Sequence, residues 1–515
     1  ARFAFCFVVG ILLPCNHIFM ERTVTVNKIG GANMSKLDQV LNLVNVLREE
    51  GETPILVVSA FKGVTNILYE MLDQLHDTDY KEDDINVAFQ PALDIVKGKI
   101  DEFIKTDEYR RMAYEHVLRE IHVVKNVLRV HKRVSKVLTP QEDTYDARDK
   151  VIAFGERSVI GVLEAFLQEN RVMAEAINDV EFHANGGNRT SQKSLHEGIQ
   201  EGIAEKMREV MHGWDEEVLI IGGHIKGTPR GMTAHLGRNY TDTTAVEVMA
   251  ALTRHMDIPV DSITMWKDVD GVMSAAPAQL DEEIDTPITF SDVSYDEAAE
   301  AAGSGMSLVH LGALQLARDL GIDLQLKNIT NPRSEGTTFS DCWNKTDNPF
   351  KIIYANEDVY VLSYKVIEMA DQHGFLAAMT AIFDDEGVSV IDTPSSGIGI
   401  DFTVKIPSDE SERLALRKRI RRINNRMRNI TVHGETYKCK MEWSTGDANL
   451  VIIGDELQQN VGVLAKVSGV LASAGINVES FVQRKPQRRM SFYIPKRDAK
   501  KAVQSLHRAF FGKKE

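Results

Sequence analysis

The sequence predicts an α/β protein, with a mainly parallel sheet followed by two small α/β modules of one type. From Val24 to about residue 330, short β-branched runs alternate with helical segments, which is typical of a parallel sheet covered by helices on both faces. Between about residues 67 and 150 the chain is charged, has helical spacing and shows no strand signal. Beyond residue 352, a pattern of turn, helix, turn and strand occurs twice, which indicates two related modules.

Five apolar runs have the composition of buried parallel strands, because they are short and rich in Val, Ile and Leu. They are TVTVN at 23–27, TPILVVSA at 53–60, EVLIIGG at 217–223, SITMW at 262–266 and IDLQLKN at 322–328. The segments Lys36–Glu50 and Thr243–Arg254 have the periodicity of helices. We therefore expect one large domain at residues 22–340, with a helical insertion at about 67–150.

The C-terminal part contains an internal repeat. The two copies are HGFLAAMTAIFDDEGVSVID at 373–392 and VGVLAKVSGVLASAGINVES at 461–480. Each copy has an amphipathic helix between Gly-bearing turns, the second at Gly387 or Gly475, and then a β-branched strand. This predicts modules at 353–445 and 446–515, joined to the first domain by a polar linker at 341–352.

Composition excludes several classes of protein. The 515 residues carry a formal net charge of −15, so a basic face for nucleic acid is not expected. The four cysteines (Cys6, Cys15, Cys342 and Cys439) are far apart and form no CxxC pair, which argues against a disulfide framework or a zinc site and for a reducing compartment. Small anionic substrates remain compatible, because they need only a local cluster of donors.

Residues 1–21 contain an apolar run with two interpretations. ARFAFCFVVGILLPCNHIFM resembles the core of a signal peptide, but it is shorter than the ~20 apolar residues that span a bilayer and lacks an A-x-A-type site. Since Met20 lies just before the first strand, the run is interpreted as upstream sequence read in frame, with a membrane-directing leader as the alternative. A cytoplasmic protein without stable membrane association is expected.

Residues with chemical potential follow the first strand. In Lys28-Ile29-Gly30-Gly31, two glycines allow backbone N–H groups to approach an anion, and Lys28 adds a positive charge. The helix is expected to begin near Ser35, which is a good N-cap residue. A tight turn without a ligand is the alternative, and no Walker A motif is present.

Further polar residues follow other predicted strands or open helices. Ser59 ends a strand, and Glu156 follows a Gly at a helix start. Arg238 can hold a carboxylate bidentately, and Thr241-Asp242 open a helix expected to be amphipathic. Asp242 either orients an ammonium group or only caps that helix.

The loop Asp268-Val269-Asp270-Gly271 follows another predicted strand. It suits a ribose or a metal ion, or else it is an ordinary Asp-Gly turn.

In this order along the chain, the motifs resemble those of aspartate kinase, from about residue 22 to the end. The motifs are Lys28-x-Gly-Gly, Val57–Asn66, Gly155-Glu156-Arg157, Leu236-Gly237-Arg238 with Asp242, Asp268-Val-Asp270-Gly271, Ser294-Tyr-Asp-Glu-Ala298 and Lys327-Asn328 with Asn331-Pro332 and Gly336-Thr337. The tail resembles paired ACT domains. The resemblance implies a carbamate-kinase-like three-layer α/β/α sandwich with a helical insertion, followed by two ferredoxin-like βαββαβ ACT domains.

The resemblance also implies a reaction: ATP and L-aspartate give ADP and 4-phospho-L-aspartate, with Mg²⁺ on the phosphates. Lys28 would stabilise charge on the transferred phosphoryl group, and Asp242 would organise Lys28 and the substrate. Glu156 and Arg238 would hold the α-ammonium and α-carboxylate groups. The implied substrate set is completed by Ser59 and Thr241, and the implied nucleotide set is Gly30, Gly31, Lys267, Asp268 and Asp270. No residue is predicted as a metal ligand, and a homodimer or larger homo-oligomer through the ACT domains is expected.

The sequence departs from the family at both substrate sites. Asn239 and Tyr240 stand where the family usually has two glycines before its hydroxyl residue and Asp. On the nucleotide side, Ala276-Pro277-Ala278 replaces Asp-Pro-Arg, and Ser307 replaces a lysine. Lys267, where many relatives carry Thr, could replace one lost cation. These changes favour a weakened or altered nucleotide site.

The Lys28-Ile29-Gly30-Gly31 form and Tyr240 resemble the ectoine-linked branch, whereas the tail resembles the lysine-sensitive branch about equally well. Five residues match effector-binding positions of lysine-sensitive relatives: Met369, Phe375, Leu376, Val390 and Ser396. Ile391 stands where an Asp would hold an amino group. Either these residues bind an effector, such as lysine, or they form the core of a dimerisation module.

Three functions remain open. Retention of Lys28, Glu156, Arg238 and Asp242 favours an active aspartate kinase, because a preserved fold alone does not require these charges. The altered nucleotide residues motivate a non-catalytic amino-acid sensor. A kinase acting on another carboxylate, such as glutamate, is the third possibility.

Overall fold

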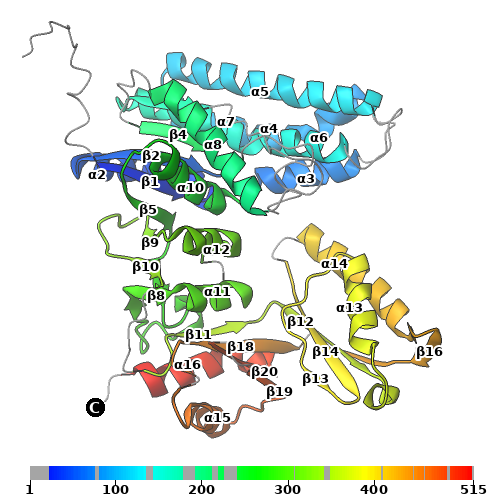
Figure 1. The fold of residues 1–515 in the computed structure, drawn as a ribbon. Helices are drawn as coiled ribbons and strands as arrows, with labels where there is room; N and C mark the ends of the chain where they lie inside the picture. The colour runs from blue at the N-terminus through cyan, green and yellow to red at the C-terminus, as the bar shows by residue number, and fades with distance from the viewer. Residues whose placement is uncertain are drawn as a thin grey trace, which may run out of the picture. The chain divides into compact units, whose positions relative to one another are not determined.

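The structure is a computed structural model, shown in Figure 1. It describes residues 23–75, 81–134, 143–177, 192–211, 218–224, 240–306, 308–341, 348–407, 410–444, 446–457, 459–483 and 488–512. The chain divides into two compact units, Ala1–Trp266 and Lys267–Glu515. Within the described residues, no helix is both long and apolar enough to cross a bilayer.

The sheet of the first unit is parallel and has the strand order β3-β4-β2-β1-β5. The strands are β1 (Thr23–Ile29), β2 (Glu52–Val58), β3 (Ala174–Ile177), β4 (Val218–Gly222) and β5 (Val260–Lys267). The four runs predicted in this unit are all strands. Ile29 pairs with Val58, and Val58 pairs with Gly222. The carboxyl ends of β1, β2 and β4 therefore meet at one edge, where ligands bind in open α/β sheets.

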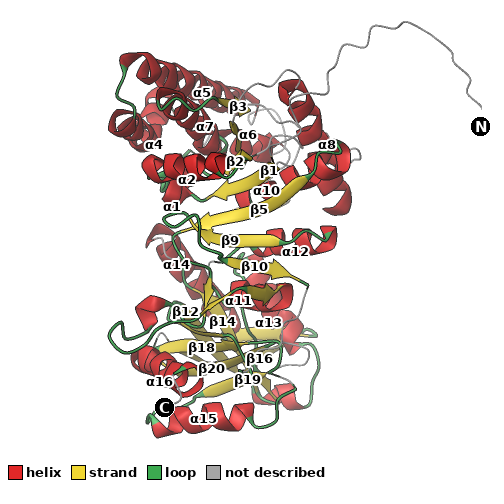
Figure 2. Ribbon diagram, turned by 90° about the vertical axis from the view of Figure 1, so that its left-hand side faces the viewer, coloured by secondary structure: helices red, strands yellow, loops and turns green. Residues whose placement is uncertain are grey.

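Helices pack on the sheet in two groups, as Figure 2 shows. They are α1 (Gly31–Met34), α2 (Leu37–Glu49), α7 (Phe154–Glu169), α8 (Gln192–Met211) and α10 (Thr241–Ala250). α2 packs against α7, and α10 packs against α8, which agrees with the predicted three-layer sandwich. A π-helical turn, Ala251–His255, continues α10.

The predicted helical stretch consists of helices and short turns in its described parts, with no strand among them. It contains α3 (Val64–Gln74), α4 (Glu82–Phe103), α5 (Asp107–Val134) and α6 (Asp143–Ile152). A buried ion pair joins α5 to α7, with Arg157 Nε 2.7 Å from Glu120 Oε2. Arg157 therefore fixes the insertion to the helix that carries Glu156.

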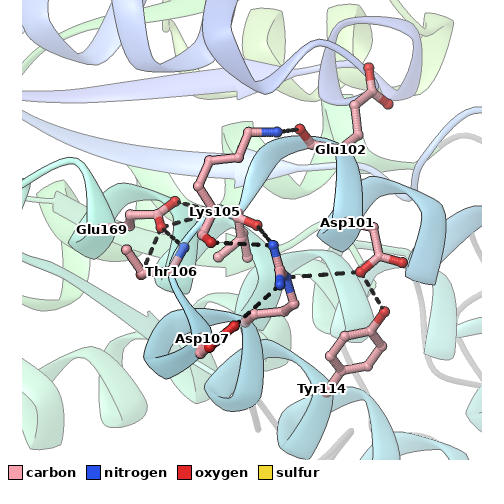
Figure 3. A network of polar contacts seen from close by, with 9 residues as sticks. Asp101, Glu102, Lys105, Thr106, Asp107, Tyr114 and Glu169 are labelled. Atoms are coloured by element: carbon pink, nitrogen blue, oxygen red, sulfur yellow. Dashed lines mark hydrogen bonds and ion pairs between the residues drawn. The ribbon is translucent and has the colours of Figure 1, made fainter.

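The turn between α4 and α5 is held by the carboxylate that ends α7, in the network of Figure 3. Glu169 Oε1 accepts hydrogen bonds from the backbone N–H groups of Lys105 (3.0 Å) and Thr106 (2.6 Å), and from Thr106 Oγ1 (2.7 Å). Tyr114 Oη donates to Asp101 Oδ1 at 2.9 Å. The insertion is thus tied to the start of α7 through Arg157 and to the end of α7 through Glu169.

The second unit begins with a three-stranded group in the order β9-β10-β8. β9 (Leu324–Asn328) is antiparallel to β10 (Thr337–Ser340), which is parallel to β8 (Asp292–Ser294). Helices α11 (Tyr295–Gly303) and α12 (Leu311–Leu320) follow β8 in the chain, and β6 (Val272–Met273) pairs with β7 (Thr289–Phe290). Ser294 and Glu297 form a capping box at the start of α11.

Two ferredoxin-like modules complete this unit. The first has the strand order β13-β14-β12-β17, and the second has the order β11-β18-β20-β19. The first module contains β12 (Val359–Lys365), α13 (Phe375–Asp385), β13 (Ser395–Ser396), β14 (Gly399–Lys405), α14 (Glu410–Met427), the hairpin β15 (Asn429–Val432) and β16 (Glu435–Lys438), and β17 (Lys440–Ser444). The second contains β11 (Ile352–Asn356), β18 (Asp447–Ile453), α15 (Val463–Ser473), β19 (Ser480–Gln483), β20 (Arg489–Pro495) and α16 (Ala499–Phe511).

The predicted boundary at residue 445 placed most residues of β11 with the first module, whereas the structure places this strand in the second. β11 pairs with β18, with Ile352 opposite Ile453, so the first module is inserted between β11 and the rest of the second. The reason is that Ile353 and Ala355 belong to the apolar core of the second module.

The repeat is confirmed in its turns and helices, but the first predicted strand is wrong, and the second begins only at Ser480, the first residue of β19. Gly374 and Gly462 precede the two helices with φ of +98° and +86°, and Gly387 and Gly475 follow them with φ of +62° and +69°. The residues after Gly387 form only an isolated bridge, Asp392 with Thr403. The Asp392 side chain enters a buried ion pair with Arg489.

Candidate functional site

The first pair of functional side chains lies at the carboxyl edge of the sheet. Lys28 is near the end of β1, and Asp242 is in the first turn of α10. Lys28 Nζ lies 2.5 Å from Asp242 Oδ1, and each side chain is 11% exposed. Such a pair fixes the position of the ammonium group.

Helix α10 differs from its predicted amphipathic form. All its residues except Met249 are buried, including Thr241, Asp242, Thr243 and Thr244. The helix packs against α8 on one side and against β1 and β2 on the other, so it has no broad solvent face. Asp242 is therefore a buried partner of Lys28 and more than a surface cap.

Glu156 lies in the first turn of α7 and is buried. Burial raises the pKa of its carboxyl group from 4.5 to about 7, although hydrogen bonds from its own backbone N–H and that of Ala60 oppose the rise. Among the described residues, its Oε2 atom has no hydrogen-bond partner. A buried carboxylate of this kind is suited to a cationic ligand group, which would satisfy its oxygen and restore its charge.

Close backbone approaches join Glu156 to the ends of β1, β2 and β4. A Cβ atom added at Gly31 would lie 2.5 Å from the carbonyl oxygen of Ala60, and one at Gly155 would lie 2.7 Å from Ala60 Cβ. A Cβ atom at Gly222 would lie 3.3 Å from Glu156 Cβ. These glycines let three strand ends and the start of α7 converge.

The chain of contacts closes through the start of α10. A Cβ atom at Gly223 would lie 2.4 Å from Thr241 Cγ2, and Thr244 Oγ1 donates to the Gly223 carbonyl at 2.7 Å. Thr241 adjoins Asp242, which contacts Lys28. Lys28, Glu156 and Asp242 therefore belong to one cluster, although they come from distant parts of the sequence.

The glycines after β1 open a helix earlier than predicted. Gly30 is the N-cap of the short helix α1, and Ser35 lies at its C-terminal end. The predicted helix, α2, begins at Leu37 close to Ser35, but its N-cap is Lys36, so the predicted N-cap role of Ser35 is wrong. Ser35 Oγ instead donates to the Gly31 carbonyl at 3.1 Å and accepts from the Lys62 N–H at 3.2 Å. The hydroxyl is used to join the first loop to the loop after β2. Ser59 lies in that second loop, half-buried, and its N–H donates to Ile29 O at 3.1 Å.

The sequence did not lead us to predict two side chains beside this cluster, those of His224 and Asp149. His224 follows Gly223 and its ring packs on Tyr240, with centroids 5.0 Å apart. His224 Nε2 lies 4.0 Å from Asp149 Oδ2, so the insertion reaches the same edge. The sequence feature that could have indicated His224 is its position directly after the glycine pair at the end of a strand. The predicted Arg238 lies outside the described residues.

A buried polar set supports β1 from its other neighbour. Trp266 Nε1 donates to Asn27 Oδ1 at 2.8 Å, and Asn33 Nδ2 donates to the Trp266 carbonyl at 3.2 Å. These bonds fix the strand that carries Lys28 against β5. No sequence motif predicted them, because the partners are 233 and 239 residues apart.

The predicted nucleotide loop begins the second unit. Asp268 and Asp270 are exposed and Lys267 is half-buried. Asn328 Nδ2 donates to Asp270 Oδ1 at 2.8 Å, and Ile329 N donates to the Lys267 carbonyl at 2.8 Å. Among the described residues, no group of three or more His, Cys, Asp or Glu side chains is placed to hold a metal ion.

The predicted effector residues have different environments. Phe375 is 2% exposed in the core of the first module, and Met369 and Val390 pack against that core. Leu376 is 50% exposed, and Ser396 is also exposed. Phe375 thus fits the core interpretation, whereas Leu376 and Ser396 are accessible to a ligand or a partner.

Comparisons with known proteins agree with this architecture. The model of the amino acid kinase family matches residues 23–328, and an ACT domain model matches residues 450–510. Aspartokinase 1, chloroplastic, of Arabidopsis thaliana is 26% identical over 495 residues, which are 95% of this chain and 81% of that protein. Lysine-sensitive aspartokinase 3 of Escherichia coli is 23% identical over 494 residues, 95% of this chain and 99% of that protein.

Solved structures show the same fold. Aspartokinase III of E. coli in complex with aspartate and ADP (R-state) has a TM-score of 0.67 at 20% identity and covers 95% of this chain and 100% of its own. Its complex with lysine and aspartate (T-state) has a TM-score of 0.70 at 20% identity, with 95% and 99% covered. Since the first family model spans more than half of the chain, the protein belongs to the amino acid kinase family.

Proposed function

We propose that this protein is an aspartate kinase, which transfers the γ-phosphoryl group of ATP to the side-chain carboxylate of L-aspartate. The observation that carries this proposal is the cluster of Lys28, Asp242 and Glu156 at one sheet edge. It combines a fixed cation with a buried carboxylate that lacks a hydrogen-bond partner at Oε2 among the described residues. The relatives over nearly the whole chain are named aspartokinases.

Each charged group has a role that follows from its environment. Phosphoryl transfer needs positioning and charge neutralisation more than covalent chemistry. The ammonium group of Lys28, held by Asp242, would stabilise charge on the transferred group. Glu156 would accept the α-ammonium group of aspartate, because that cation restores the ionised form which burial disfavours. Arg238 remains the predicted partner of the α-carboxylate.

The nucleotide would be ATP with Mg²⁺. Mg²⁺ bound to the phosphates would neutralise their charge, and such ions take few protein carboxylates. Asp268 and Asp270 provide two exposed carboxylates, which fit a metal ion that arrives with the nucleotide.

An amino-acid effector acting through the ACT domains, and a homo-oligomer formed by them, are part of the same proposal. The E. coli relative is named lysine-sensitive, and one of its structures contains lysine. Titrating lysine, threonine and neutral amino acids into the kinase assay identifies the effector.

The test uses the purified full chain with Mg-ATP, L-aspartate and hydroxylamine, which traps the acyl phosphate as aspartyl hydroxamate. The wild-type protein should form hydroxamate, and Lys28→Met should lower turnover ~10²–10³-fold, the loss typical of one charge-stabilising donor. Lys36→Met, at an exposed lysine nearby, should leave turnover unchanged.

Two results would replace this proposal. Aspartate binding without hydroxamate would favour the non-catalytic sensor suggested by Ala276, Ala278 and Ser307. Hydroxamate from glutamate and not from aspartate would favour a kinase for a different carboxylate.

A further inference from the structure

A buried arginine connects three segments of the second unit. Arg489 is the first residue of β20, and it is 5% exposed. Its Nη2 atom lies 2.6 Å from Asp392 Oδ1 in the first module, and its Nη1 atom donates to Ser304 Oγ, at the end of α11, at 3.1 Å. Glu300 Oε2, also on α11, lies 3.7 Å from Arg489 Nε. A guanidinium with partners on several segments fixes their relative positions, because leaving it unpaired when buried is costly.

The backbone beside Ser304 is held by both modules. Asn356 Nδ2, from β11 of the second module, donates to the Ser304 carbonyl at 2.9 Å. Lys405 Nζ, from β14 of the first module, lies 3.5 Å from the Gly305 carbonyl. Gly305 has φ of +103°, and a Cβ atom there would lie 2.5 Å from Asn356 Nδ2. This turn is therefore tightly packed against β11.

The turn is followed in the chain by the elements that carry the proposed nucleotide-binding side. It precedes α12, whose C-cap is Gly321 with φ of +67°, and the chain then enters β9 at Leu324. Because this connection is short, helix and strand run in opposite directions. The start of α12 therefore lies at the end of β9 that carries Asn328, the partner of Asp270.

Asp392 links the same arginine to the predicted effector segment. It lies two residues after Val390 in the chain and is 4% exposed. Tyr493 Oη donates to Asp392 Oδ2 at 3.2 Å and accepts from Thr403 Oγ1 at 2.8 Å. A shift of the segment around Val390 would thus move the carboxylate that holds Arg489.

We infer that Arg489 is a positioning residue that holds the Ser304–Gly305 turn for nucleotide binding and couples that turn to Asp392 in the first ACT module. The inference rests on the proposed kinase function, since it assigns Arg489 a role in positioning the proposed nucleotide-binding residues. Arg489 acts through the turn and is not placed against the reacting atoms. A purely structural ion pair would lower stability without a selective effect on nucleotide affinity.

The experiment compares Arg489→Met, Arg489→Lys and Asp392→Asn with the wild-type full chain. Each variant should raise the KM for ATP about tenfold, the effect of one charge-assisted hydrogen bond, and change the KM for aspartate less than twofold. The double variant Arg489→Met with Asp392→Asn should be no worse than the more severe single variant, because the two residues act as one unit. Arg426→Met is the matched control, since Arg426 pairs with Asp385 within the first module, Nη2 to Oδ2 2.5 Å.

Direct binding of a fluorescent ADP analogue separates this inference from the proposed function. If the wild-type protein makes no hydroxamate, the kinase proposal fails, but weaker analogue binding by the variants still supports the role of Arg489. If Arg489→Met does not fold, Arg489→Lys and Asp392→Asn decide the matter. Folded variants with unchanged nucleotide affinity, or with the same change as Arg426→Met, overturn the inference.

Discussion

Replacing Glu156 with glutamine should stabilise the ligand-free protein above neutral pH and remove its site for an ammonium group. The Glu156 carboxyl is buried, with no hydrogen-bond partner for Oε2 among the described residues. Ionising such a group costs free energy, because water is replaced by a medium that solvates charge poorly. Glutamine has nearly the same shape and never carries that charge.

The magnitude follows from the raised pKa. Folding moves the pKa of this carboxyl from 4.5 to about 7, which corresponds to about 3 kcal/mol. Since the folded-state pKa is higher, the folded chain holds the proton more tightly than the unfolded chain. The stability contributed by the protonated form is fully present below pH 4.5 and is lost as pH rises through 7. The glutamine amide leaves its own hydrogen bonds unmet, so the expected gain above pH 7 is about 1–3 kcal/mol.

Urea unfolding of the ligand-free full chain between pH 5 and pH 8.5 measures this effect. The difference between Glu156→Gln and wild type should increase from pH 5 to pH 7.5 and then stay constant. Glu201→Gln, at an exposed site on α8, is the matched control and should show no such pH dependence. The wild-type protein should bind aspartate more tightly as pH rises from 6 to 8, and Glu156→Gln should lose this binding. A variant that is no more stable than wild type at pH 8, or a difference independent of pH, would refute the reasoning.

Two further predictions concern packing. Gly223→Ala should lower kcat/KM about a hundredfold with the fold retained, because the new Cβ would lie 2.4 Å from Thr241 Cγ2 and 2.7 Å from Thr241 Cβ and would displace the start of α10. Gly98→Ala, where no atom lies within 4 Å of the added Cβ, is the control and should keep activity. Equal activity of the two variants in the hydroxamate assay would contradict this account. Phe375→Ala should lower the free energy of unfolding by about 3–5 kcal/mol, since the ring is 2% exposed in a core. Leu376→Ala, at a side chain 50% exposed, should change the free energy of unfolding by less than about 0.5 kcal/mol. Similar values for the two variants from urea titrations would contradict the assignment of Phe375 to the core.

The sequence by itself determined much of the architecture. Apolar runs of strand length and polar caps are local signals, so β1, β2, β4, β5 and β9 lie within a few residues of their predicted bounds. The positions of Lys28 near the end of β1 and of Glu156 in the first turn of α7 followed from the same local patterns. The repeat predicted the turns at Gly387 and Gly475, because a positive φ suits glycine.

Only the tertiary structure decided which distant groups meet. Ser35 has the chemistry of an N-cap, yet its hydroxyl bonds to Gly31 and Lys62 instead. Likewise, the placement of β11 in the second module's sheet and the meeting of Arg489 with Asp392 and Ser304 join residues about 100 to 185 positions apart. Local propensity acts over a few residues, whereas these contacts depend on burial and on satisfying polar groups in a finished core.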